Sequence, residues 1–278
     1  MRLDGYLSKP FKLLRGLRQG CPLSPILFDI FDNDWLGPPG VIRLHIGVTV
    51  PGIPFAKEGL MAGLLFADDL VGMASSLEDA RFLAQVISDW CIRWEMEVGI
   101  KKCGVMCVGG KAIKVDMDRR QMELHEEPPL LMGMPIPVVE EYVYLGLVID
   151  RMVDLATMAA GRVKKAEMAY RKIQPFLVDQ NIPIATRVMM LKAVVGSTLL
   201  YGSEVWGMSK LRCNKGQTLM NKAIRILMMV KEADDTIRVT ATWREMGIPP
   251  VHAEAAARRA RALIKFPSLE TWVCTLAI

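Results

Sequence analysis

The sequence predicts an α+β fold in two parts, with strands confined to residues 1–150 and helices alone in residues 151–278. Up to Asp150, short apolar runs are broken repeatedly by Gly and Pro, a pattern typical of strands and turns. Beyond Asp150, Gly and Pro thin out and apolar residues recur at the spacing of helices. We therefore place a domain boundary at about residue 150.

The composition is that of a folded globular protein, because 51% of the residues are hydrophobic and only 23% are charged. The net charge of +5 is compatible with a polyanionic partner but does not establish one. Six cysteines lack the paired spacing of a zinc site, so reduced thiols are expected. The sequence shows no secretory pattern and no apolar run long enough to span a bilayer. We therefore expect an intracellular protein without a membrane segment.

The first elements are predicted from cap and alternation signals. Ser24 and Pro25 suit the start of a helix, with Ser24 as N-cap, and Gly37 to Pro39 end it. Val41 to Val50 alternates apolar residues with others and predicts a strand.

Two adjacent carboxylates, Asp68 and Asp69, separate the apolar runs Gly63 to Phe66 and Leu70 to Met73. Apolar runs of this length around a turn residue predict a β-hairpin with the acids at its tip. Either the acids only make the turn and stay solvated, or they bind a hard cation such as Mg²⁺.

Ser75 and Glu78 match a capping box, followed by an amphipathic helix with Gly99 as its C-cap. Val105 to Val108 and Tyr142 to Ile149 predict strands, with a less regular stretch of short strand-like pieces between them. Helices are then expected over 155–177, 185–201, 211–230 and 251–266.

A Gly-flexed loop, Gly16 to Pro25, leads into the first helix. The N–H groups at a helix N-terminus favour phosphate, and Arg18 and Gln19 are suited to meet a phosphate or a base edge. The other interpretation is an ordinary loop with a Ser-Pro cap.

The loop Gly16-Leu17-Arg18-Gln19-Gly20-Cys21-Pro22-Leu23-Ser24-Pro25 and the hairpin Phe66-Ala67-Asp68-Asp69 together closely resemble the reverse transcriptase palm of non-LTR (LINE-type) retrotransposons. The resemblance implies an incomplete polymerase-type palm, an antiparallel sheet with packed helices, in residues 1–150. Residues 151–278, including Leu200 to Gly207, resemble the helical thumb and post-thumb region that comes after it.

The implied chemistry is nucleotidyl transfer by two Mg²⁺ ions from dNTP to a DNA primer on an RNA template. Asp68 would be the main metal ligand, with Asp69 beside it, and Phe66 would pack beneath the hairpin. The residues that the resemblance assigns to substrate and template binding are Arg18, Gln19, Gly20, Pro22, Ser24, Phe66 and Ala67.

Two downstream segments extend the resemblance. Lys102 matches a lysine that approaches the leaving pyrophosphate, although a solvated surface lysine is the alternative. Tyr144, Leu145 and Gly146 lie in a segment that resembles the hairpin gripping the primer strand.

The family's metal site also needs an aspartate from an earlier palm strand, and its fingers hold template and nucleotide. This sequence begins only a few residues before the Gln19 loop, and Asp4 is a poor substitute. We therefore expect a reverse transcriptase fragment that does not polymerise DNA by itself. The alternatives are a non-catalytic nucleic-acid-binding remnant of a retroelement and a helical protein whose acid pair is only a turn. The resemblance leaves a nuclear location open, and nothing indicates the oligomeric state.

Basic residues cluster on two of the expected helices. They are either phosphate contacts of a thumb or solvated faces. The first cluster is Arg162, Lys164, Lys165, Arg171 and Lys172, and the second is Arg258, Arg259, Arg261 and Lys265.

Overall fold

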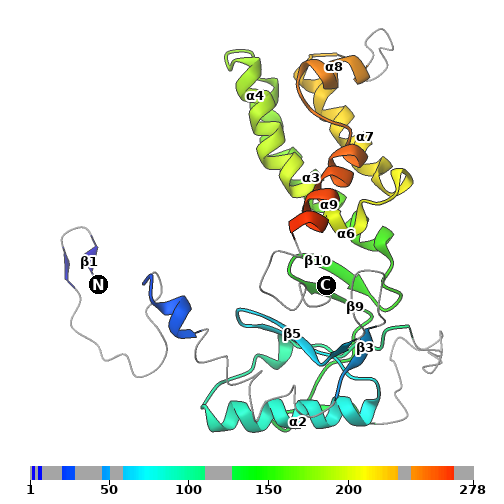
Figure 1. Ribbon diagram of the computed structural model, residues 1–278. Coiled ribbons are helices and arrows are strands. Elements are labelled where there is room, and N and C mark those ends of the chain that lie inside the picture. Colours follow the sequence, from blue (N-terminus) through cyan, green and yellow to red (C-terminus); the bar gives the residue numbers. More distant parts are fainter. Residues whose placement is uncertain are drawn as a thin grey trace, which may run out of the picture. The chain divides into compact units, whose positions relative to one another are not determined.

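A computed structural model describes residues 2–3, 6–7, 21–28, 46–50, 59–109, 127–230 and 239–265 (Figure 1). The chain divides into two compact units, each of which is described by itself. The first unit contains Met1–Pro51, Glu58–Val98 and Pro129–Pro135, and the second contains Gly52–Lys57, Gly99–Pro128 and Ile136–Ile278. Helices and small antiparallel sheets occur together, so the α+β class predicted from the sequence is confirmed.

The strands of the first unit form two-stranded antiparallel hairpins. Their bounds are β1 Arg2–Leu3 with β2 Tyr6–Leu7, β3 Val48–Val50 with β4 Gly59–Met61, β5 Gly63–Phe66 with β6 Asp69–Gly72, and β7 Leu130–Leu131 with β8 Met134–Pro135. The strand predicted over Val41 to Val50 is described only from residue 46, and the helix predicted from Ser24 only to Phe28. The remainder of both lies outside the described residues.

Helix α2, Leu77–Arg93, packs against the β5–β6 hairpin through Leu83, which contacts Ala62 and Leu70. Its N-cap is Ser76, one residue later than the predicted Ser75, because the Ser76 hydroxyl accepts a hydrogen bond from the Asp79 N–H at 3.0 Å. The helix also holds the β7–β8 hairpin, whose Met132 N–H donates to Ser88 Oγ at 2.9 Å.

The predicted C-cap at Gly99 is wrong, because α2 ends at Arg93. Glu95 has a φ of 54° and occupies the left-handed position that usually selects glycine. The Met96 N–H donates to the Cys91 carbonyl at 2.8 Å and the Glu95 N–H to the Ile92 carbonyl at 3.3 Å, which is a Schellman motif. A non-glycine residue thus ends the helix earlier than the glycine signal indicates.

Two predicted strands differ from the structure. Val105 to Val108 is reduced to one parallel bridge between Val105 and Val138, in the second unit. The apolar pattern over Tyr142 to Ile149 predicts a single strand, whereas the structure has a hairpin there, as the family resemblance implies. Its strands are β9, Glu141–Tyr144, and β10, Leu147–Asp150. Leu145 and Gly146 make its turn, with φ values of 46° and 81°. A short 3-10 helix, η2 Ile100–Lys102, precedes this region in the unit.

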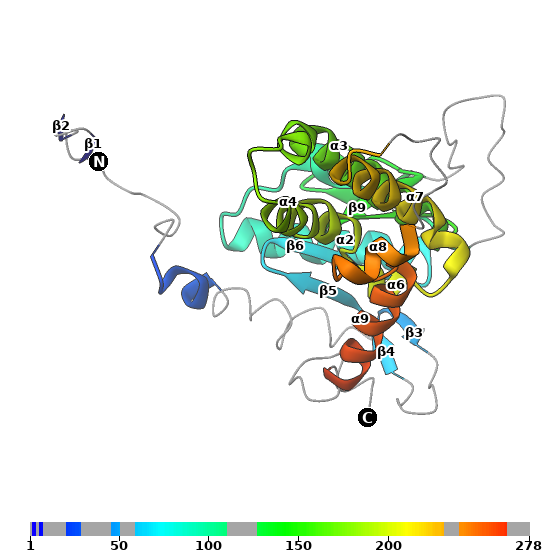
Figure 2. The ribbon, with the colours of Figure 1, turned by 90° about the horizontal axis from the view of Figure 1, so that it is seen from above.

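The helices of the second unit, seen from above in Figure 2, bury the larger hydrophobic core. They are α3 Leu155–Val178, α4 Ile184–Met190, η3 Leu191–Gly196, α5 Ser197–Leu199, α6 Ser203–Trp206, α7 Lys210–Leu227, α8 Val239–Glu245 and α9 Val251–Lys265. The predicted helices over 155–177, 211–230 and 251–266 correspond to α3, α7 and α9, whereas α6 and α8 are short helices that the periodicity did not indicate.

The core lies between α3 and α7. Helix α3 buries Met158, Val163, Ala166 and Leu177 along one face, with Asp154 as its N-cap. Helix α7 buries a matching set, Leu219, Met220, Ala223, Ile224 and Leu227. The apolar stripe at helical spacing that predicts these helices is therefore the surface that packs them together.

The helix predicted over 185–201 is one helical stretch with a π-helical centre. Helix α4 runs directly into η3, whose six residues are π-helical, and then into α5. A π-helical turn inserts residues into the α-helical repeat and rotates the next helical segment about the axis. Leu191, Val195 and Leu199 are all fully buried along this stretch.

Because Leu191 is 0% exposed, Leu191→Ala should lower the free energy of unfolding by about 2–5 kcal/mol. Leu211 is 79% exposed, so Leu211→Ala is the matched control and should change it by less than about 0.5 kcal/mol. Urea unfolding followed by circular dichroism measures both. Equal losses in the two variants would contradict the placement of the core.

Candidate functional site

The acidic hairpin forms as predicted. Strands β5 and β6 pair from Gly63 with Gly72 to Phe66 with Asp69, which leaves Ala67 and Asp68 as a two-residue turn. Ala67 has a φ of 52°, the backbone conformation that tight hairpin turns require at this position. Asp68 and Asp69 are both exposed, so their carboxylates are accessible at the tip.

Phe66 differs from its expected packing role. Its side chain is 62% exposed, so it does not pack beneath the hairpin. The half-buried side chains of the hairpin are instead those of Leu64, Leu65, Leu70 and Val71. Phe66 pairs with Asp69 at the last position before the turn, at the exposed end of the hairpin.

Within the described residues, no group of three or more His, Cys, Asp or Glu side chains is placed to hold a metal ion. The acidic hairpin therefore offers two carboxylates. Mg²⁺ is commonly bound through one or two carboxylates together with substrate phosphates, so this donor set fits one side of a magnesium site.

The structure describes the predicted loop only in part. Arg18, Gln19 and Gly20 lie outside the described residues. Pro22 and Ser24 belong to the segment 21–28, which is helical from Ser24, one residue before the predicted first helical position. The Ser24 N–H donates to the Cys21 carbonyl at 3.1 Å and the Leu27 N–H to the Leu23 carbonyl at 3.0 Å.

Lys102 and the hairpin that carries Tyr144, Leu145 and Gly146 lie together in the second unit. Lys102 is exposed at the end of η2, and its carbonyl accepts a hydrogen bond from the Tyr142 hydroxyl at 2.8 Å. Because Tyr142 belongs to β9, this bond ties the backbone of Lys102 to the β9–β10 hairpin.

Two side chains from α3 and one from the turn between α5 and α6 hold the turn of the β9–β10 hairpin. The Tyr201 hydroxyl donates to the Leu145 carbonyl at 2.8 Å. The Gly146 carbonyl accepts from Lys165 Nζ at 3.1 Å and from the Arg162 guanidinium at 3.3 Å. We call these three residues, Arg162, Lys165 and Tyr201, the turn clamp.

The first basic cluster is therefore not one solvated face. Arg162 is only 7% exposed, and burial lowers the pKa of its guanidinium from the ordinary value. Lys164, Arg171 and Lys172 are exposed on the same helix. Arg162 could have been found in the sequence, because it follows Met158 and precedes Ala166 at helical spacing and so falls on the apolar stripe of α3.

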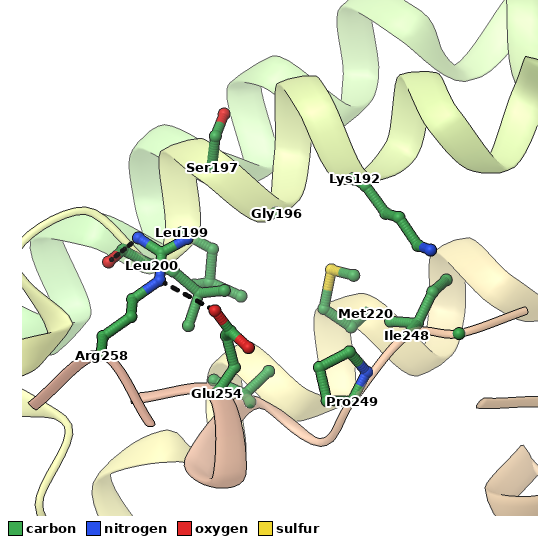
Figure 3. Close-up of a pocket in the computed structure, with 12 residues that line it drawn as sticks. Lys192, Gly196, Ser197, Leu199, Leu200, Met220, Ile248, Pro249, Glu254 and Arg258 are labelled. Carbon is green, nitrogen blue, oxygen red and sulfur yellow. Dashed lines mark hydrogen bonds and ion pairs between the residues drawn. The ribbon is translucent and has the colours of Figure 1, made fainter. Parts of the chain in front are cut away.

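The second basic cluster also contains an internal contact. Arg258 donates to the Leu200 carbonyl at 3.1 Å and to Glu254 at 3.3 Å (Figure 3). Arg261 lies 3.8 Å from Glu254. Leu200, Glu254 and Arg258 border a pocket of about 210 Å³ between the stretch from Lys192 to Leu200 and the segment from Gly247 to Arg258. Arg259 is half-buried and Lys265 is exposed.

Comparison with known proteins identifies the family. The model for "Reverse transcriptase (RNA-dependent DNA polymerase)" matches residues 1–149, more than half of the 278 residues, and the chain belongs to this family. Its relatives indicate the non-LTR, LINE-type kind of reverse transcriptase that the motifs resemble.

Three curated relatives come from Drosophila melanogaster. The chain is 22% identical over 270 residues to the "Probable RNA-directed DNA polymerase from transposon BS" and 22% identical over 242 residues to the "RNA-directed DNA polymerase from mobile element jockey". It is 18% identical over 266 residues to the "Probable RNA-directed DNA polymerase from transposon X-element". The alignments cover 94%, 80% and 91% of this chain but only 27%, 23% and 26% of those proteins, so the chain spans about a quarter of their length.

In the part of the chain that the structure describes, no helix is both long enough and apolar enough to cross a membrane.

Ala67 gives a test of the acidic hairpin. A β-branched side chain is disfavoured at a φ of 52°, so Ala67→Val should destabilise the turn by about 1–2 kcal/mol. In Ala67→Gly, relief of strain in the turn and the greater flexibility of the unfolded chain nearly cancel. The stability of the turn should therefore change by less than about 0.5 kcal/mol. Hydrogen exchange of peptides covering residues 63–72 measures both, and faster exchange in the glycine variant than in the valine variant would contradict the turn.

Proposed function

We propose that this chain supplies part of the palm, within residues 1–150, and the thumb and post-thumb helices, within residues 151–278, of an RNA-directed DNA polymerase from a non-LTR retrotransposon. The observation that carries the proposal is the acid pair at the two-residue turn of the β5–β6 hairpin, inside the segment that matches the reverse transcriptase model. In the complete protein the substrates would be an RNA template, a DNA primer and dNTP.

Asp68 and Asp69 are the proposed metal ligands, with Asp68 as the main one. When bound, two Mg²⁺ ions would supply activation of the primer 3′ oxygen and neutralisation of charge on the triphosphate. The chain's own contribution is geometric, because four consecutive residue pairs between β5 and β6 fix the turn that carries both carboxylates. Charged groups that the fold already holds in position supply much of the catalysis in phosphoryl transfer, because they need not reorganise during the reaction.

The remaining assignments belong to the same proposal. Lys102 would stand near the leaving pyrophosphate. Tyr144, Leu145 and Gly146 would grip the primer. The template and nucleotide contacts would come from Arg18, Gln19, Gly20, Pro22, Ser24, Phe66 and Ala67, and the high exposure of Phe66 supports a contact role over a packing role for that side chain.

We further propose that this polypeptide alone does not polymerise DNA. Among the described residues, the acidic hairpin offers two adjacent carboxylates without a third acidic group nearby. Two like charges without an opposing ligand repel each other and hold a divalent cation weakly. The same observation favours a second candidate function, in which the chain binds nucleic acid without catalysis.

The decisive experiment compares the chain with a longer protein. The 278-residue chain should bind a primer–template without extending it in Mg²⁺. Joined to a preceding segment that carries the family's additional palm aspartate, it should extend the primer. Asp68→Asn in the longer protein should then reduce incorporation at least about 100-fold while changing duplex affinity less than about twofold.

Asp89→Asn is the matched control, because Asp89 is an exposed acid on α2 whose carboxylate accepts a hydrogen bond from the Gln85 amide at 2.7 Å. It should leave incorporation unchanged. Undiminished Mg²⁺-dependent extension by Asp68→Asn would contradict the ligand assignment. A longer protein that binds but never extends would favour the non-catalytic function.

A further inference from the structure

The turn of the β9–β10 hairpin is in a conformation that its own sequence does not favour. Both turn residues have positive φ, 46° at Leu145 and 81° at Gly146. Glycine adopts this region freely, but a leucine there costs about 1–2 kcal/mol. The turn is therefore expected to need support from outside the hairpin.

The turn clamp provides that support, and it acts on backbone atoms. Tyr201 binds the Leu145 carbonyl, while Lys165 and Arg162 bind the Gly146 carbonyl. Hydrogen bonds to backbone carbonyls fix the orientation of the peptide planes irrespective of side-chain identity. Both carbonyls of the turn are thus directed toward the helices.

The clamp is itself anchored. Arg162 also donates from Nε to the Thr198 carbonyl at 3.0 Å and from its second terminal nitrogen to the same oxygen. Thr198 lies in the last turn of the helical stretch that ends at Leu199, where carbonyls lack helical partners. The guanidinium stands 4.7 Å from the centre of the Tyr201 ring, so one buried cation fixes both the helix end and the tyrosine.

Close packing completes the arrangement. A Cβ built on Gly146 would lie 3.5 Å from the Tyr201 ring, so the turn rests directly on that ring. A Cβ on Gly202 would lie 2.8 Å from Leu147 Cδ2, so the glycine after Tyr201 leaves room for the strand after the turn. The segment 201–202 therefore packs closely against the hairpin, both at its turn and at the start of β10.

We propose that Arg162, Lys165 and Tyr201 are positioning residues for the primer terminus, acting through the Leu145–Gly146 turn and not by touching the primer themselves. This inference rests on the proposed function, in which that turn grips the primer. It separates the basic residues of α3 into two roles, because Lys165 would act on the turn while its exposed neighbour Lys164 is free to attract phosphate.

The test uses the full 278-residue chain with two DNA–RNA duplexes of equal length, one with a recessed DNA 3′ end and one blunt. Wild type should prefer the recessed end. Tyr201→Phe removes only the hydroxyl, and Lys165→Met removes only the amine. Each should lower that preference about three- to tenfold, the effect expected for one lost hydrogen bond, while the melting temperature of the chain stays within a few degrees.

Lys164→Met is the matched control, with the same change of charge one residue away on the same helix. It should weaken binding to both duplexes equally and lower the salt dependence, leaving the preference intact. Lys165→Arg, unlike Lys165→Met, should keep the wild-type preference for the recessed end, because arginine retains a cationic donor at this position. Hydrogen exchange of peptides covering residues 141–150 should accelerate in Tyr201→Phe and in Lys165→Met but not in Lys164→Met.

The outcomes separate the two proposals. A wild-type chain without preference for the recessed end overturns the proposed primer contact, and the positioning role with it, whatever the exchange data show. A wild-type preference that Tyr201→Phe and Lys165→Met both retain overturns the positioning role alone. Loss of affinity for both duplexes in parallel with a lower melting temperature also overturns it, because the clamp would then serve only stability.

Discussion

The second unit depends on one buried guanidinium. Arg162 joins α3 to the Thr198 carbonyl at the end of the long helical stretch, to the Gly146 carbonyl in the hairpin turn, and to the face of the Tyr201 ring. Burying a charge is costly unless hydrogen bonds replace water, and here backbone carbonyls accept from it. Helix, helix end and hairpin are thereby held in one arrangement that none of them specifies by itself.

The elements that the sequence predicted well are those set by local patterns. Apolar runs around Asp68 and Asp69 indicate the acidic hairpin, and apolar spacing indicates α3, α7 and α9. Two of the wrong predictions arise where a residue other than glycine occupies a backbone position with positive φ. Glu95 takes the left-handed position expected of Gly99, and the segment from Tyr142 reverses at Leu145, although leucine is a poor turn residue.

The candidate site divides in the same way. The acid pair, Lys102 and the segment at Tyr144 each lie in a short contiguous motif, so the sequence alone is enough to propose them as candidates. The contact between Tyr201 and Leu145 joins residues 56 positions apart and depends on how α3 and the helix after it pack. The basic cluster on α3 likewise resembles one surface until the apolar stripe is considered, which assigns Arg162 to the interior.

The π-helical stretch Leu191–Gly196 has an evolutionary consequence. Each residue of an α-helix advances the chain by about 100°, so removing one residue here would rotate the remainder of the helical stretch by that angle. Thr198 and Tyr201 would then face away from Arg162. A single-codon deletion or insertion within this stretch would therefore uncouple the helices from the hairpin.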